Sequence, residues 1–163
     1  MMNEERPARS IGWREAVAAA SVVVSLAFVA YEIHQNTAAV RAQTLQAISD
    51  NHSAIMRETF LRDDLEPLIA RVFAGAGLDD FTPEENGKLG AFYMIYLAHL
   101  ENTYVQRNAG FIDDAVFASY GWRNRILTTK HFRATVTSGE LLSATVSPEF
   151  QQFFLNWLST HTD

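Results

Sequence analysis

Histidine and carboxylate side chains are the groups in this sequence best suited to metal binding or proton transfer. Metal sites on helices typically use Glu-x-x-His or His-x-x-x-His spacing, and no histidine here has such a partner. His99 and Glu101 are two residues apart, and residues at this spacing point to different sides of a helix. Only a long-range assembly of this pair with His52 and Glu58 could supply ligands, so we expect no metal ion and no cofactor. The five histidines are His34, His52, His99, His131 and His161.

Glu101 is the most unusual carboxylate in the sequence. It lies on or near the apolar face of a predicted helix that also carries Tyr104, where an unpaired charge is costly. The simplest interpretation is a buried glutamate hydrogen-bonded to a tyrosine, to Trp122 or Arg123, or to a helix N-terminus near Asp113. The alternatives are a ligand-contacting carboxylate with a raised pKa, and an exposed side chain. A ligand site in this region would be built from Glu101, Tyr104 and His99.

Signatures of catalysis and of nucleic-acid binding are missing from the sequence. Cysteine is absent, which excludes thiolate nucleophiles, disulfides and cysteine-ligated metals. No serine has a Gly-x-Ser-x-Gly context, and the Gly75-Ala76-Gly77 turn lacks the Lys-Ser/Thr of a phosphate-binding loop. The net charge is −6, from 13 basic and 19 acidic residues, whereas nucleic-acid binding relies on clustered cations. We therefore expect neither enzymatic activity nor a nucleic-acid partner. The single basic patch, interpreted as a solvated helix face, consists of Arg123, Arg125, Lys130 and Arg133.

The element that precedes these residues is an uncharged apolar segment from Ala16 to Tyr31. Extended to Ile11–Ile33 it is long enough to span a bilayer as a helix, since about 20 residues suffice. Trp13 and Tyr31 flank it where aromatic rings prefer the headgroup level, and Arg14 can reach the interface along its own stem. Residues 1–35 are thus predicted to be an N-terminal tail and one transmembrane helix that inserts into the lipid bilayer.

Two other interpretations of this segment remain open. It could be a cleaved signal peptide, with Ser25-Leu26-Ala27 as the cleavage site, or the buried helix of a soluble protein, because the uninterrupted run is short. Arg6, Arg9 and Arg14 precede the segment and only Arg41 follows closely. This bias predicts a cytoplasmic N-terminus in the bacterial inner membrane and a periplasmic C-terminal domain.

Residues 36–163 are predicted to form a helical bundle, which makes the chain all-α with about four to five helices in the bundle. Neither Gly nor Pro occurs between Trp13 and Glu66, so one helix is expected to run from the membrane segment to about Arg62. Its amphipathic stripe (Ile33, Val40, Thr44, Ile48, Ile55) predicts a core face. The alternative is a homo-oligomeric coiled coil, with Ser21 and Ser25 as a contact inside the bilayer.

Helix-capping residues and the spacing of apolar residues predict the positions of the later helices. A short helix is expected from Leu65 to Ala74, started by Asp64 and ended by Gly75-Ala76-Gly77. Thr82-Pro83-Glu84-Glu85 then opens a helix that runs to about Asn108. A helix from Asp113 to Thr128 is expected next, burying Val116, Phe117, Tyr120 and Ile126 or Leu127. Residues 129–146 have no clear period, and Ser147-Pro148 begins the last helix.

The order of these features resembles a group of uncharacterised bacterial proteins, which are small membrane-anchored helical domains of unknown function. The resemblance rests on the Gln-rich helix EIHQNTAAVRAQTLQAI, on Glu101 within LAHLENTYVQRNAGFIDD, on the Gly-Phe-Ile-Asp turn at 110–113, and on Trp122 in the following helix. It implies a bacterial origin, a membrane location and a helical fold, and it implies no reaction.

Three functions are compatible with the sequence. The first is a non-enzymatic interaction or scaffold module whose protein partner is unknown. The second is a sensory or ligand-binding bundle with a pocket near Glu101, which an apolar cavity would favour. The third is an enzyme with unrecognised carboxylate or histidine chemistry, which requires His99, Glu101 and a residue of the first helix to lie within about 4 Å of one another.

Overall fold

The computed structural model describes residues 12–138 and 140–161, and the part of the chain that it describes contains helices joined by turns and no β-strand. This confirms the all-α prediction. The chain divides into two compact units, Met1–Val40 and Arg41–Asp163. Within the described ranges the α-helices are α1 (Trp13–Phe60), α2 (Glu66–Phe73), α3 (Pro83–Asn108), α4 (Asp114–Ser119), α5 (Lys130–Thr137), α6 (Glu140–Thr145) and α7 (Pro148–Thr160). Two 3-10 turns, η1 (Leu78–Asp80) and η2 (Arg125–Thr128), complete the fold.

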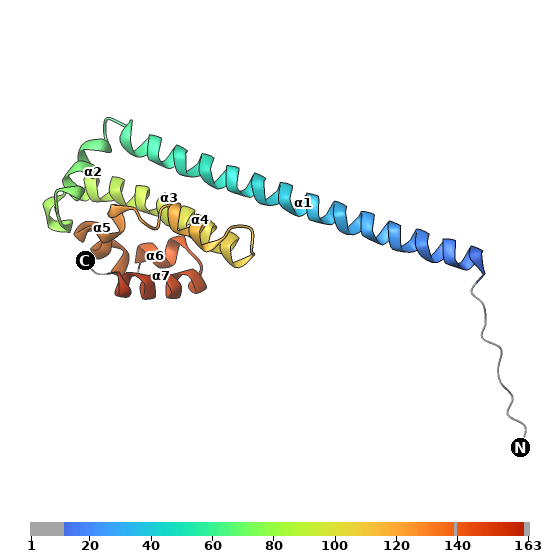
Figure 1. Cartoon of the computed structure of the whole chain (residues 1–163). Helices are drawn as coiled ribbons and strands as arrows, with labels where there is room; N and C mark the ends of the chain where they lie inside the picture. The colour runs from blue at the N-terminus through green and yellow to red at the C-terminus, as the bar shows by residue number, and fades with distance from the viewer. Residues whose placement is uncertain (1–11, 139, 162–163) are drawn as a thin grey trace, which may run out of the picture. The chain divides into compact units, whose positions relative to one another are not determined.

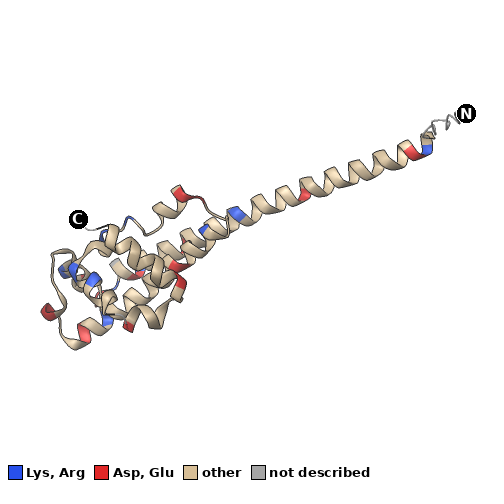
Figure 2. Cartoon of the chain, turned by 90° about the horizontal axis from the view of Figure 1, so that it is seen from below, with Lys and Arg blue, Asp and Glu red and all other residues tan. Residues whose placement is uncertain are grey.

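Helix α1 is a single 48-residue helix, as the absence of Gly and Pro predicts, and it ends two residues before Arg62. Its first half has no charged residue between Glu15 and Glu32, and this stretch is the long uncoloured part of the helix in Figure 2. The hydroxyl groups of Ser21 and Ser25 donate to backbone carbonyls one turn earlier, at 2.9 and 2.8 Å. Ile11, Arg6 and Arg9, on which parts of the membrane prediction rest, lie outside the described residues.

Helix α2 begins later than the sequence predicts. Asp64 does not cap it, because both carboxylate oxygens of Asp64 accept hydrogen bonds from Arg62 at 3.0 Å. The N-cap position is Leu65, which provides no side-chain cap. The predicted end is correct: Gly75 follows the C-cap with a φ of 99°, a left-handed conformation that favours glycine.

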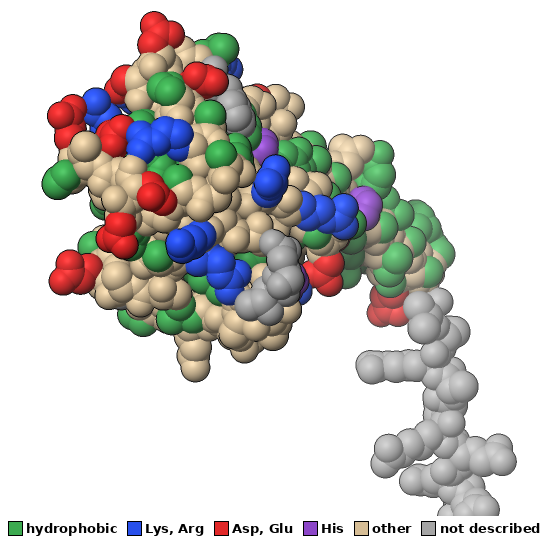
Figure 3. Space-filling model, turned by 90° about the vertical axis from the view of Figure 1, so that its left-hand side faces the viewer, with side chains coloured by type: hydrophobic (Ala, Val, Ile, Leu, Met, Phe, Trp, Pro, Cys, Tyr) green, Lys and Arg blue, Asp and Glu red, His purple; other side chains and the backbone are tan. Residues whose placement is uncertain are grey.

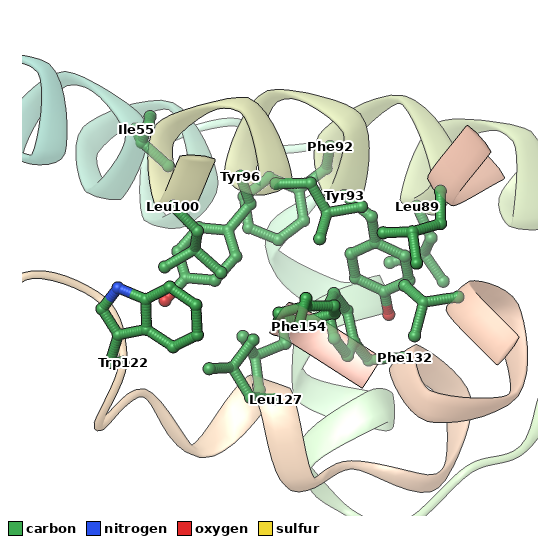
Figure 4. Close-up of a cluster of buried hydrophobic side chains, with 14 of the residues drawn as sticks. Ile55, Leu89, Phe92, Tyr93, Tyr96, Leu100, Trp122, Leu127, Phe132 and Phe154 are labelled. Carbon is green, nitrogen blue, oxygen red and sulfur yellow. The ribbon is translucent and has the colours of Figure 1, made fainter. Parts of the chain in front are cut away.

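Helix α3 begins with the predicted capping box. The Glu85 N–H donates to the Thr82 hydroxyl at 3.2 Å, and the Thr82 N–H donates to the Glu85 carboxylate at 2.8 Å. Together these bonds satisfy two of the N–H groups that a helix start leaves unpaired. The 26-residue helix supplies the central face of the core (Figure 4), which comprises Leu89, Phe92, Tyr93, Tyr96, Leu97, His99, Leu100 and Thr103.

The predicted helix from Asp113 to Thr128 is wrong beyond Ser119, because the chain turns sharply at Gly121. Gly121 has a φ of 92°, and a Cβ at this position would lie 2.9 Å from the side chain of Leu100. The glycine therefore breaks the helix and lets the turn pack directly on α3. Phe117 is buried as predicted, but Val116 and Tyr120 are only half-buried, while Ile126 and Leu127 are both buried in η2.

The region without a clear period, residues 129–146, contains two short helices, α5 and α6. This explains why the fold has more helices than predicted. In Figure 1 α3 lies over α6 and α7, and both α3 and α7 contact α6. The predicted cap of α7 is confirmed, since the Phe150 N–H donates to the Ser147 hydroxyl. Trp122 joins α7 to the core, and its ring lies within 6 Å of the rings of Phe117, Phe150, Phe153, Phe154 and Trp157.

Candidate functional site

The three residues predicted to form a ligand site do not converge. His99 faces α1, whereas Glu101 faces the start of α7 and Tyr104 faces the first turn of α7. The two-residue spacing of His99 and Glu101 turns their side chains to different sides of α3, as helical geometry requires. The structure brings His99 together with the first helix, but it does not add Glu101 to that contact.

His99 is the buried centre of a polar contact between α3 and α1. Its Nε2 atom lies 3.3 Å from His52 Nδ1, and its Nδ1 atom lies 3.3 Å from Asn51 Nδ2. If the amide of Asn51 donates to Nδ1, the neutral His99 ring carries its proton on Nε2 and donates it to His52. Tyr120 packs its ring edge against His52 at a centroid distance of 5.9 Å. Both ring nitrogens of His99 are therefore engaged by residues of α1.

The environment of this histidine pair opposes protonation. Burial, and secondarily the neighbouring His52, lower the pKa of His99 to about 4. Partial burial also lowers the pKa of His52. The two facing nitrogens can share one proton, but two protonated rings would place one N–H group against another. At neutral pH the pair therefore acts as a neutral hydrogen-bonded contact between the two helices.

Glu101 is half-buried and stabilises the start of α7. Its Oε1 atom accepts the N–H of Ser147, the N-cap residue of α7, at 2.9 Å. The predicted partner, a helix N-terminus near Asp113, is wrong, because Glu101 contacts the start of the helix after Ser147. A carboxylate at this position also interacts favourably with the partial positive charge of the helix start. Trp122 and Arg123 are not its partners, since the Trp122 N–H donates to Thr103.

Tyr104 lies beside a shallow depression and not in an enclosed pocket. Its hydroxyl donates to Glu149 at 3.0 Å, and its ring packs on Phe150 and Phe153. The depression has a volume of about 520 Å³ and is wide open to solvent. It is lined by Tyr104, Glu149, Gln152, Phe153 and Asn156, and does not include Glu101.

His131 forms a buried polar chain that sequence reasoning missed. Its Nδ1 atom lies 3.0 Å from the Tyr93 hydroxyl, and its Nε2 atom lies 2.8 Å from Asn86 Oδ1. Burial raises the pKa of Tyr93 and lowers that of His131. These two hydrogen bonds link α3 to α5 and satisfy both nitrogen atoms of the histidine ring, which is typical of a structural contact. The periodic spacing of Tyr93 on the core face was its only signal in the sequence.

An apolar groove lies between the C-terminal part of α1 and α3, entirely within residues 51–95. Its volume is about 330 Å³. Apolar side chains from both helices and from Leu65 form most of its lining, and charged side chains stand at its rim. The lining residues are Asn51, Ala54, Ile55, Glu58, Arg62, Asp64, Leu65, Lys88, Ala91, Phe92 and Ile95.

Two residues of the basic patch make separate structural contacts. Arg125 packs on the ring of Phe73, and Arg133 donates to the carbonyl groups of Leu158 and His161 at the end of α7. Both acidic and basic side chains occur on the face shown in Figure 3. Within residues 12–138 and 140–161, no group of three or more His, Asp or Glu side chains could hold a metal ion.

Comparisons with protein-family models, with curated proteins and with solved structures give no match to this chain. The resemblance to uncharacterised membrane-anchored bacterial proteins therefore stays a prediction. Function must be argued from the geometry of the chain itself, in particular from α1 and from the groove that its C-terminal part forms with α3.

Proposed function

We propose that this protein is a single-pass membrane-anchored helical module that acts through interactions and not through catalysis. The supporting observation is the first half of α1, which is long and apolar enough to cross a membrane and has no part of its most apolar window buried. Val24 is 67% exposed and Phe28 is 60% exposed. Figure 3 shows hydrophobic side chains (green) gathered on the surface of the part of α1 that extends from the bundle. An apolar surface of this size needs a cover, and a bilayer provides one.

The alternative interpretations of this segment receive less support. A core helix of a soluble protein would bury its apolar residues, and these are exposed. A cleaved signal peptide ending near Ala27 would cut α1 in the middle of a continuous helix. Trp13 and Tyr31 are exposed at the two ends of the apolar run, in keeping with positions at the membrane interface.

Membrane fractionation tests this proposal. The full-length chain should sediment with membranes, resist extraction by high salt and be released by a mild detergent. Replacing Val24 and Phe28 together by Asp should move much of the chain to the soluble fraction, because each acidic residue at the centre of a span costs roughly 2.5–3.5 kcal/mol. Leu61→Asp is the matched control, since Leu61 is an exposed apolar residue outside the span and its replacement should change nothing. A full-length chain that stays soluble without detergent refutes the proposal.

Orientation is tested separately. Because more arginines precede the apolar segment than follow it, we propose that the bundle lies on the periplasmic side of a bacterial inner membrane. Because the chain has no cysteine, Ser159→Cys gives a single exposed thiol in α7. A membrane-impermeant maleimide added to intact cells whose outer membrane has been permeabilised should label this thiol. Labelling only after the inner membrane is broken would place the bundle in the cytoplasm.

The second candidate is the sensory or ligand-binding bundle, and the groove between α1 and α3 favours it. The groove is apolar with polar groups at its edge, which is the usual composition of a small-molecule site. It lies away from Tyr104 and Glu101, so the site that this function needs is at the junction of α1 and α3.

A further inference from the structure

We propose that the groove between α1 and α3 binds a small amphipathic amine, with the apolar body of the ligand against both helices and its ammonium group at Glu58. This site rests on the ligand-binding candidate above and does not depend on membrane anchoring. Nothing in the interaction-module proposal requires a small molecule to occupy this groove.

The space in the groove results from small residues that are next to large buried ones. Ile55 of α1 projects toward α3 and is buried, as is Phe92 (Figure 4). The residue directly before each of them is an alanine, Ala54 on α1 and Ala91 on α3, and both alanines line the groove. Large residues here would have closed the gap between the helices, so the alanines leave an apolar space.

The exposure of Ile95 indicates that the groove is left uncovered by the rest of the bundle. Ile95 lines the groove and is 59% exposed, although Phe92, three residues earlier on α3, is buried. A bound apolar molecule would remove this side chain from water, with a gain of roughly 25 cal/mol per Å² of apolar surface covered. The volume of about 330 Å³ is at the lower end of small-molecule sites, and it is too small for a helix of another chain.

The charges at the rim favour a cationic ligand. Arg62 is already bound to Asp64 through two nitrogens, and Lys88 is bound to Glu84 at 3.0 Å. The remaining charged residue of the lining is Glu58, whose carboxylate attracts Arg62 but forms no ion pair with it or with another side chain among the residues that the structure describes. Glu58 is therefore the carboxylate of the lining that is left to form an ion pair with the ammonium group of a ligand.

Asn51 offers a second acceptor in the same groove. Its amide nitrogen lies 3.3 Å from His99, which leaves the side-chain oxygen available to a donor. Asn51 and Glu58 are seven residues apart on α1, so they share one face and are separated by roughly 10 Å along the helix. The two polar ends thus bracket an apolar floor, and a short amine with an aryl or alkyl body fits this pattern.

Direct binding of dansylcadaverine to the full-length chain in nanodiscs of zwitterionic lipid tests the proposal. This fluorescent amine should bind saturably, with a blue-shifted emission, and an unlabelled alkylamine should displace it. Empty nanodiscs give the background, and dansylamide, which has the same fluorophore without the amine, measures the contribution of the charge. No saturable signal above the empty nanodiscs overturns the proposal.

Two variants examine the apolar part of the groove. Ala91→Phe fills the space and should weaken binding about tenfold or more. Ile95→Lys adds a like charge at an exposed position that tolerates it, and should abolish binding even if Ala91→Phe does not fold. Ala115→Phe, at an exposed alanine of α4, is the matched control and should bind normally. Unchanged binding in folded Ala91→Phe or Ile95→Lys places the ligand elsewhere and refutes the site.

A third variant examines the charge. Glu58→Gln should weaken dansylcadaverine binding about threefold, because the lost ion pair is near the surface, and should not change the weaker binding of dansylamide. Glu140→Gln, at an exposed glutamate of α6, is its control. Equal affinity of Glu58→Gln and the unaltered chain for the amine overturns the assignment of a cationic ligand. Fractionation of the same variants should be unchanged, so failure of this site and failure of the membrane anchor can be distinguished.

Discussion

Lowering the pH from 7.5 to 4.5 should destabilise the bundle through His99. This side chain is 1% exposed, and its two ring nitrogens contact only Asn51 and His52. The rings that face it are the second imidazole on α1 and the phenol of Tyr96 on α3, and neither is a carboxylate that could stabilise an imidazolium. A proton on His99 would therefore be buried without a counter-charge.

The magnitude follows from the pKa of His99, which burial lowers from 6.5 to about 4. Above pH 6.5 the ring is neutral in the folded and in the unfolded chain, so it makes no pH-dependent contribution. Below pH 6.5 the unfolded chain binds a proton that the folded chain does not, and the free energy of unfolding falls by up to about 1.4 kcal/mol per pH unit. Between pH 6.5 and 4 the loss from His99 reaches about 3 kcal/mol.

Thermal unfolding of the full-length chain in detergent micelles, followed by tryptophan fluorescence at a series of pH values, measures this loss. A loss of about 3 kcal/mol corresponds to a decrease in Tm on the order of 10 °C for a domain of this size. His52 and His131 also have lowered pKa values, so their contributions have the same sign and steepen the decrease.

His99→Gln should reduce the pH dependence in this range, at the cost of lower stability at neutral pH, because His52 loses its partner. His34→Gln is the control, since His34 is exposed on α1, and this change should leave the pH dependence intact. A Tm that is constant between pH 7 and 4.5, or a pH dependence that survives in His99→Gln, would refute the argument that burial keeps this histidine neutral.

Three further substitutions test individual contacts, each by thermal or chemical unfolding. Gly121→Ala should destabilise the chain by at least about 1–2 kcal/mol, because the residue needs a positive φ and its Cβ would meet Leu100; wild-type stability would contradict the turn geometry. Trp122→Phe should cost about 1–3 kcal/mol, since the buried hydrogen bond to Thr103 is lost, and a neutral effect would exclude that bond. Glu101→Gln should cost less than about 1 kcal/mol, because an amide oxygen can still accept from the N-cap of α7, whereas a large gain in stability would indicate a functional carboxylate held at a cost.

Features that depend on local sequence were predictable in this chain. The continuity of α1 follows from the absence of Gly and Pro, and the start of α3 follows from the Thr82–Glu85 capping box. Such signals act within one or two helical turns, so a single sequence contains all the information that they need. Gly121 is a local signal that the prediction overlooked. The apolar spacing on both sides of it favoured one continuous helix, whereas this glycine ends the helix.

Features that depend on which helices meet were not predictable. His99 was recognised as a candidate, but its partners are 47 and 48 residues away, and only the packing of α1 on α3 decides that they face one another. The partner of Glu101 is 46 residues further along the chain for the same reason. The groove was not predicted because it results from the small side chains of Ala54 and Ala91. Alanine is a favourable residue anywhere in a helix, so its presence in the sequence gives no sign of a groove.

The contact between Trp122 and Trp157 has a spectroscopic consequence. The two indole rings lie 5.4 Å apart at an interplanar angle of 69°, close enough for their electronic transitions to couple, while Trp13 is exposed at the start of α1. The folded bundle should therefore have a strong near-ultraviolet circular dichroism signal that comes from this pair and disappears when α7 separates from the core. The chain thus contains its own optical probe of the bundle, one that reports separately from the apolar segment of α1.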